Sequence, residues 1–214
     1  MSGGPNRVEL VGTYGSDLSH ALSAWTSTSR DLDDDKRARV PKLLRYLAEN
    51  KHHTPFEKSA QHFLVTSDIA SHIHILKHRI AVSVNAESAR YKELSDDKYY
   101  VPTDWPPDEV ERYVVFLESA LDQYHETLER LVAGGMKRKR AKESARFYLP
   151  YGNQIKCDVQ FNFRSLMHFA GLRFKPDAQL EIREICREML RLVWLTGDFN
   201  KSLAAFGYDG IHLI

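Results

Sequence analysis

The residues best suited to chemistry lie between positions 77 and 91, where the sequence reads KHRIAVSVNAESARY. Arginine guanidinium groups bind phosphate through paired hydrogen bonds, and short hydroxyl and amide side chains can complete such a donor set. This stretch supplies both kinds of group, in Lys77, His78, Arg79, Ser83, Asn85, Ser88 and Arg90. It therefore predicts an anion-binding segment, with a solvated basic turn as the simpler alternative for a charge run of this kind.

Three other segments carry the same mixture of Arg, His, Asn and Ser beside apolar runs, at residues 52–57, 146–150 and 162–173. Such side chains bind phosphates, amide edges and ring nitrogens. They suit an anionic, heterocyclic ligand or cofactor better than a nucleophilic mechanism. The sequence contains no G-x-G-x-x-G or P-loop motif, no serine in an elbow context and no plausible Cys-His pair.

Composition limits the classes of protein to consider. A chain of 214 residues, 43% of them hydrophobic, is expected to form a single domain over residues 1–214 with a loose start at 1–7. The formal net charge of +1 does not favour a nucleic-acid or membrane partner, and no apolar run is long enough to span a bilayer, so a cytoplasmic protein is expected. Cys157 and Cys186 fall on apolar periodic faces, which predicts buried thiols.

The apolar pattern predicts an α+β (mixed α/β) fold, with a central, mostly antiparallel sheet of three or four strands flanked by several helices. Strands are expected at 8–14, 60–67 and 155–161. One helix should begin at Pro41, and another should bury Ile69, Ile73 and Leu76. The clearest helix, expected from Asp108 to Gly134, is a long scaffold helix.

The four polar segments, in order, resemble elements of the flavin-dependent thymidylate synthase family. Residues 77–91 are similar to its Arg-His-Arg followed by Ser-x-Asn-x-x-Ser-x-Arg-Tyr, and residues 52–57 to its His-x-Thr/Ser-Pro-Phe-Glu. The other two segments are similar to its Ala-Arg-x-x-Leu-Pro and Asn-x-Arg-Ser-Leu-x-His/Asn-Phe-x-x-Leu-Arg elements. Each match is weak alone, but four collinear matches from about Val40 to Ile185 are specific.

The chain departs from the family pattern within residues 77–87. Lys77 stands where the family has Arg, which keeps the charge but loses the bidentate fork. The gap between Arg79 and Ser88 is one residue longer, with Val82 as the apparent insertion. Glu87 sits one place later than the family's glutamate, and Ala86 occupies its position. We expect this loop to bulge and keep Ser88 and Arg90 in place; alternatively, the site favours a related ligand or reaction.

The resemblance implies an enzyme that makes dTMP from dUMP without a cysteine nucleophile, as a homotetramer with shared active sites. It implies FAD as the hydride carrier, NADPH as the reductant and 5,10-methylenetetrahydrofolate as the carbon donor. The implied dUMP-binding residues are His74, Ser88, Arg90, Arg146 and Arg173. The implied FAD-binding residues are His52, Thr54, Lys77, His78, Arg79, Glu87, Asn162 and His168. Arg173 would be catalytic, because it would lie where negative charge develops on the pyrimidine.

Two other functions remain open at this point. A related flavoenzyme on the same scaffold could modify a different pyrimidine nucleotide or transfer a different group. A nucleic-acid-binding module could use Lys137–Lys142 and the basic residues of 77–92, although the near-neutral net charge counts against it. His74 and His78, four residues apart, could hold a metal, but no third ligand is evident, and no metal is expected.

Overall fold

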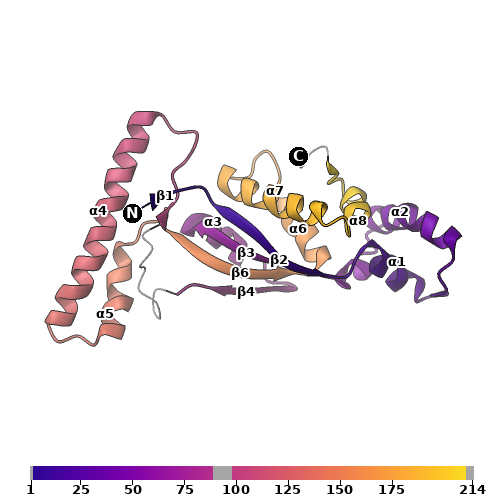
Figure 1. Ribbon diagram of the computed structural model, residues 1–214, viewed down its shortest axis with the longest axis horizontal. Helices are drawn as coiled ribbons and strands as arrows, with labels where there is room; N and C mark the ends of the chain where they lie inside the picture. The colour runs from indigo at the N-terminus through magenta and orange to yellow at the C-terminus, as the bar shows by residue number, and fades with distance from the viewer. Residues whose placement is uncertain (1, 89–97, 211–214) are drawn as a thin grey trace. The chain divides into compact units, whose positions relative to one another are not determined.

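The computed structural model describes residues 2–88 and 98–210, which form an α+β fold. Its main sheet has four antiparallel strands in the order β2-β3-β6-β4 (Figure 1). These strands are β2 (Arg7–Tyr14), β3 (Ala60–Asp68), β6 (Gln154–Phe161) and β4 (Val82–Ala86). The predicted mixed fold with a mostly antiparallel central sheet is confirmed.

Strand β4 occupies the segment for which the sequence predicted a bulged loop. At one end, the N–H of Asn162 donates to the carbonyl of Ala81 (3.3 Å); at the other, the N–H of Glu87 donates to the carbonyl of Lys156 (2.8 Å). Five residues lie between the paired positions on both strands, so β4 has no bulge between Ala81 and Glu87, and the bulge prediction was wrong. Inward and outward side chains alternate from Val82 to Ala86, which explains the regular strand.

Backbone contacts divide the chain into two compact units. The described part of unit 1 comes from Met1–Arg7, Val65–Lys77 and Asn85–Cys157, and that of unit 2 from Val8–Leu64, His78–Val84 and Asp158–Ile214. The single-domain organisation stays a prediction, and each unit is described by itself.

Unit 2 contains the helices α1 (Asp17–Trp25), α2 (Asp34–Glu49), α6 (Phe163–Arg173), α7 (Leu180–Leu195) and α8 (Asn200–Ala205), and the short helix η1 (Thr54–Glu57). An aromatic cluster of Phe56, Phe163 and Phe199 surrounds His20 in its core. The ring nitrogens of His20 lie 2.9 Å from the hydroxyl of Ser202 and 2.8 Å from that of Ser59. This buried histidine therefore ties three segments of unit 2 together.

Helix α2 begins seven residues earlier than the predicted start at Pro41. The carboxylate of Asp33 caps the helix by accepting from the N–H of Lys36 (2.7 Å). The carboxylates of Asp34 and Asp35 in the first turn interact favourably with the positive end of the helix dipole. Pro41 therefore lies inside the helix. The prediction failed because it placed Pro41 at the first helical position, whereas the aspartates before it form the helix start.

Unit 1 contains α3 (Ile69–Leu76), α4 (Pro107–Ala133), α5 (Arg138–Ala145) and η2 (Arg146–Tyr148), with the two-residue strands β1 (Ser2–Gly3) and β5 (Lys98–Tyr99) in parallel. The predicted scaffold helix is confirmed as α4, which buries Leu117, Leu121, Tyr124 and Leu128. The N-terminal segment is bound rather than loose, because the Gln154 amide donates to the carbonyls of Gly4 and Pro5 (both 3.2 Å).

Helix α3 buries a different face from the predicted one. Ile73 and Leu76 are 38% and 45% exposed, while Ser71, His72 and Ile75 are buried. Asp68 caps the helix by accepting from the N–H of Ser71 (2.8 Å). The polar residues Ser71 and His72 thus occupy the buried side, which hydrophobicity alone did not indicate.

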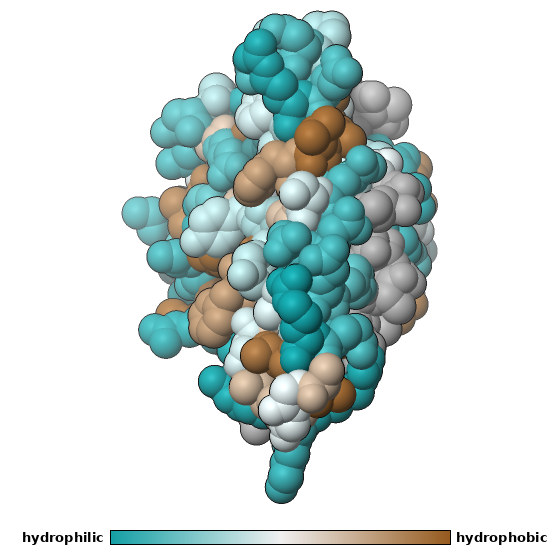
Figure 2. All heavy atoms as spheres, turned by 90° about the vertical axis from the view of Figure 1, so that its left-hand side faces the viewer, coloured by the Kyte–Doolittle hydropathy of each residue, from teal (hydrophilic) through white to brown (hydrophobic). Residues whose placement is uncertain are grey.

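The basic run Lys137–Lys142 lies at the start of α5, which packs beside α4 (Figure 1). Arg138 pairs with Glu129 (2.9 Å) and Arg140 with Glu143 (3.6 Å), so carboxylates neutralise part of the run. In the face shown in Figure 2, hydrophilic residues predominate and apolar residues form separate patches. Among the described residues, no helix combines the length and apolarity required to cross a membrane.

Candidate functional site

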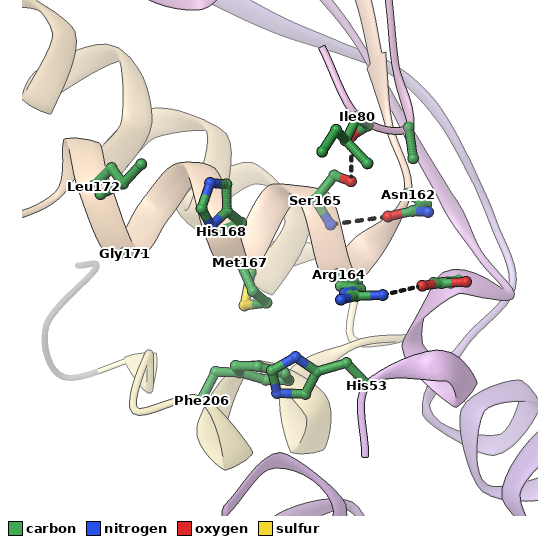
Figure 3. A pocket seen from close by; sticks show the side chains of 12 residues that line it. His53, Ile80, Asn162, Arg164, Ser165, Met167, His168, Gly171, Leu172 and Phe206 are labelled. Carbon is green, nitrogen blue, oxygen red and sulfur yellow. Dashed lines mark hydrogen bonds and ion pairs between the residues drawn. The ribbon is translucent and has the colours of Figure 1, made fainter. Parts of the chain in front are cut away.

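A cavity of about 540 Å³ lies along α6 in unit 2; we call it the α6 cavity (Figure 3). Its polar lining comes from His53, Glu57, Asn162, Arg164, Ser165 and His168. The other lining residues are Ile80, Ala81, Met167, Gly171, Leu172 and Phe206. It thus joins η1, the turn before β4, α6 and the residue after α8.

The first turn of α6 is fixed by side-chain hydrogen bonds. The Oδ1 atom of Asn162 accepts from the N–H of Ser165 (2.8 Å), which makes Asn162 the N-cap of the helix. The Ser165 hydroxyl donates to the carbonyl of Ile80 (2.8 Å), and Arg164 forms an ion pair with Glu57 (Figure 3). These contacts hold α6 against η1 and the turn before β4, so the polar groups have defined positions.

Aromatic and apolar side chains complete the α6 cavity. The rings of His53 and Phe206 lie 5.5 Å apart, and Met167 projects from α6 toward them (Figure 3). Phe56 packs behind Phe206 with ring centroids 4.9 Å apart. A concave site with apolar walls and a few fixed polar groups is typical of a binding site for a planar heterocycle.

Arg173, the last residue of α6, is fixed by His78. Its Nε group donates to Nε2 of His78 (3.1 Å). The His78 ring packs 4.9 Å from Phe169 and 5.8 Å from the ring of His168, which lines the α6 cavity. Burial raises the pKa of the nearby Cys186 thiol well above its usual range, and the positive charge of Arg173 opposes this only in part. The arginine therefore donates to an imidazole nitrogen that carries no proton and lies near a protonated thiol.

The structure brings four of the predicted residues of unit 2 together. Asn162 and His168 line the α6 cavity, and His78 and Arg173 are joined beside it.

The other predicted residues of unit 2, His52, Thr54 and Arg79, are exposed and do not line this cavity. The ring of His52 instead packs edge-on against Tyr46, 6.1 Å away.

Four polar residues of the α6 cavity were missed from the sequence: His53, Glu57, Arg164 and Ser165. Glu57 and Arg164 belong to the matched segments at 52–57 and 162–173. Their opposite charges, in two segments expected to meet at one ligand, could have indicated the pair. His53 gave no signal that separated it from His52, because the two are neighbours of the same type.

The remaining predicted residues belong to unit 1. His74 lies half-buried in the last turn of α3, Lys77 is its exposed C-cap, and Ser88 is half-buried after β4. Arg146 is exposed on η2. Arg90 lies outside the described residues.

The Glu87 side chain, which the family resemblance assigns to FAD binding, makes a different contact in this structure. Its carboxylate accepts from the N–H of Lys156 (2.9 Å), next to its own backbone hydrogen bond to that residue. In this structure it closes the end of the β4–β6 pairing. A role at flavin would require that carboxylate to release or share this bond.

Comparison with known proteins identifies the family. The family model described as thymidylate synthase complementing protein matches residues 9–195. The chain belongs to this family. A relative from Kosmotoga olearia, named flavin-dependent thymidylate synthase, is 31% identical over 83% of this chain and 80% of its own length. A relative of the same name from Tropheryma whipplei is 32% identical over 95% of this chain and 92% of its own length.

Solved structures of enzymes with a similar fold support this family assignment. The UMP/dUMP methylase PolB from Streptomyces cacaoi, bound with 5-Br dUMP, superposes with a TM-score of 0.81 at 29% identity and 98% coverage of both chains. The same protein bound with 5-Br UMP gives a TM-score of 0.76 at 28% identity, covering 97% of this chain and 98% of its own. This protein is therefore an enzyme of the methyltransferase type.

Proposed function

We propose that this chain converts dUMP to dTMP, with 5,10-methylenetetrahydrofolate as the carbon donor, NADPH as the reductant and FAD as the cofactor. The names of its relatives and the dUMP analogue bound to PolB support a flavin-dependent reaction on a uracil nucleotide. The single observation that carries the proposal is the α6 cavity with the Arg173–His78 pair beside it.

The α6 cavity fits a flavin ring in chemistry and form. His53, Asn162, Arg164 and His168 would supply hydrogen-bonding groups, and Met167 and Phe206 an apolar surface. When bound there, flavin supplies the hydride that completes the methyl group. A hydride route needs no cysteine nucleophile, which agrees with the buried positions of Cys157 and Cys186.

Arg173 is the residue to which we assign catalysis. Its guanidinium would lie at the edge of the pyrimidine, where negative charge develops as the ring is activated. One fixed donor aimed at such a charge can contribute roughly 3–4 kcal/mol to transition-state stabilisation. His78 would serve this role by fixing the orientation of Arg173, rather than by contacting flavin alone.

Unit 1 would supply groups for the nucleotide. Arg146 and Arg90 would bind its phosphate, with His74 and Ser88 as further contacts. Arg146 is exposed and is followed by Phe147, which is 84% exposed. Such an uncovered aromatic beside a cation agrees with a surface completed by a ligand or a neighbouring subunit. We therefore propose a homotetramer with shared active sites.

The test uses the purified protein with its flavin. It should be yellow, and it should form dTMP only when dUMP, 5,10-methylenetetrahydrofolate and NADPH are all present, as measured by chromatography and mass spectrometry. A protein that stays colourless after addition of FAD would exclude the proposed function.

A second candidate is methylation of UMP. It is favoured by the solved PolB structures, which hold analogues of both nucleotides and match this chain over nearly its whole length. The changes at Val82 and at Ala86–Glu87 lie beside Ser88, a proposed nucleotide contact. The ratio of kcat/KM for dUMP and UMP, with the mass of each product, decides between the two substrates.

A further inference from the structure

A second concave surface in unit 2, of about 320 Å³, lies between the end of α1 and the exposed side of α2; we call it the α2 groove. It is lined by Trp25, Arg39, Lys42, Leu43 and Tyr46. The four α2 residues follow one another at i, i+3, i+4 and i+7, so they form one stripe along the helix. This stripe is separate from the core of unit 2, to which α2 contributes Val40, Leu44 and Leu47.

Two aromatic rings line the α2 groove without being covered. Tyr46 is 53% exposed, and Trp25 is half-buried. The ammonium of Lys36 lies 5.5 Å from the centre of a Trp25 ring and donates to the carbonyls of Ser29 (2.8 Å) and Asp31 (2.6 Å). These bonds hold one side of the groove in place. Uncovered aromatic rings of this kind bind planar rings by stacking.

Two cations stand beside these rings. Within residues 2–88 and 98–210, neither Arg39 nor Lys42 forms an ion pair, in contrast to exposed arginines such as Arg130 and Arg138. Arg39 uses its Nε group on the carbonyl of Asp35 (3.3 Å), which is one of its five donors. The groove therefore combines fixed aromatic surface with positive charge that no carboxylate neutralises.

These features define the ligand class. Stacking surfaces select a planar ring, and neighbouring Arg and Lys side chains select phosphate. An arginine beside an adenosine site is also how dinucleotide-binding proteins accommodate a 2′-phosphate. The chain has no glycine-rich phosphate motif, so side chains must bind any dinucleotide phosphate.

One ring contact and one peptide bond connect the α2 groove with the α6 cavity in unit 2. The ring of Tyr46 lies 6.1 Å from that of His52, and the next residue, His53, lines the α6 cavity. We propose that the α2 groove binds the 2′-phosphoadenosine end of NADPH. This inference rests on the proposed function, in which NADPH reduces a flavin in the α6 cavity.

The first experiment measures binding without turnover. Adenosine 2′,5′-bisphosphate is titrated into the intact flavin-containing protein by isothermal calorimetry, and we expect saturable binding. The Arg39→Ala/Lys42→Ala variant should bind it at least about tenfold more weakly, because two charge-assisted contacts are lost. The matched control is Arg37→Ala, an exposed residue about 200° around α2 from Arg39, and its affinity should change by less than about twofold.

The second experiment measures steady-state kinetics. In Arg39→Ala/Lys42→Ala the KM for NADPH should rise about tenfold or more, with the KM for dUMP and the flavin content unchanged. NADH, which has no 2′-phosphate, should be used with the same KM by the variant and the wild type.

The outcomes separate this inference from the proposed function. The groove proposal would be overturned if adenosine 2′,5′-bisphosphate showed no saturable binding up to about 10 mM, roughly the weakest Kd expected of a specific site. This outcome would count even in a protein that forms dTMP. Equal weakening in Arg37→Ala would overturn it as well. Binding that depends on Arg39 and Lys42 in a protein without thymidylate synthase activity would support the groove site and exclude the reaction.

Discussion

The Nε group of Arg173 donates a hydrogen bond of 3.1 Å to Nε2 of His78. Because that nitrogen accepts, the imidazole is neutral and carries its proton on Nδ1. His78 is only 8% exposed and packs edge-on against Phe169, so this acceptor has little freedom to move. The pair joins a residue that the family resemblance assigns to flavin with one that it assigns to the pyrimidine.

His78→Phe should therefore lower kcat about tenfold to hundredfold, because a displaced Arg173 no longer points at the developing charge. Phenylalanine keeps the ring that packs on Phe169 but has no acceptor for the guanidinium. Single-turnover dTMP formation and the flavin absorbance of each purified variant provide the measurement.

The control for this prediction is His78→Gln, whose amide oxygen can replace the Nε2 acceptor. It should recover most of the lost kcat, with flavin content equal in both variants. Equal losses in the two variants, or loss of flavin from both, would show that His78 acts on the cofactor and not through Arg173.

The α6 cavity distinguishes two adjacent histidines. His53 lines it, whereas His52 is exposed and packs on Tyr46. His53→Ala should weaken flavin binding about tenfold, because a ring contact of the cavity is lost, and His52→Ala should change it by less than about twofold. Titration of the apoprotein with FAD, followed by fluorescence quenching, measures both. A larger effect at His52 would contradict the assignment of this cavity to flavin.

Long periodic elements were predictable because their apolar residues repeat at the spacing of a single secondary structure. Helix α4 and strand β6 are examples, and Leu117 and Val159 on their apolar faces are buried. Short elements were not predictable where polar residues decide the packing. Helix α3 buries Ser71 and His72, and α2 begins at a capping aspartate instead of at Pro41.

The candidate site also combines residues that the sequence indicated with contacts that it did not. The resemblance to the family motifs indicated Asn162, His168 and Arg173, of which the first two line the α6 cavity and the third lies beside it. The partners of these residues came only from the structure: Arg164 meets Glu57, and Arg173 meets His78, across 107 and 95 positions of the chain. No local pattern encodes contacts between residues so far apart in sequence.

The buried His20 should make stability fall in mild acid. Burial lowers its pKa from 6.5 to about 4, so between these values the unfolded chain binds a proton that the folded protein does not. The free energy of unfolding should therefore decrease as the pH falls from 6.5 toward 4, by roughly 3 kcal/mol for this one group.

Urea unfolding of the wild type and of His20→Gln at pH 7, 5.5 and 4 measures this effect. Burial also lowers the pKa of His72 and raises that of Asp17, so only the difference between the two proteins isolates His20. The variant should be less stable at pH 7, and the difference should shrink as the pH falls. Parallel pH dependences would show that His20 does not contribute.

The two cysteines should be dispensable for turnover. Cys157 and Cys186 are both fully buried, and burial raises the pKa of Cys186 far above neutrality, so neither offers a thiolate to a nucleotide. Cys157→Ala and Cys186→Ala should keep kcat for dTMP formation within about threefold, with any loss matched by lower stability. Iodoacetamide should alkylate both thiols in urea and neither in the native protein. Alkylation of a thiol in the native protein, with loss of activity, would contradict this prediction and support a cysteine nucleophile.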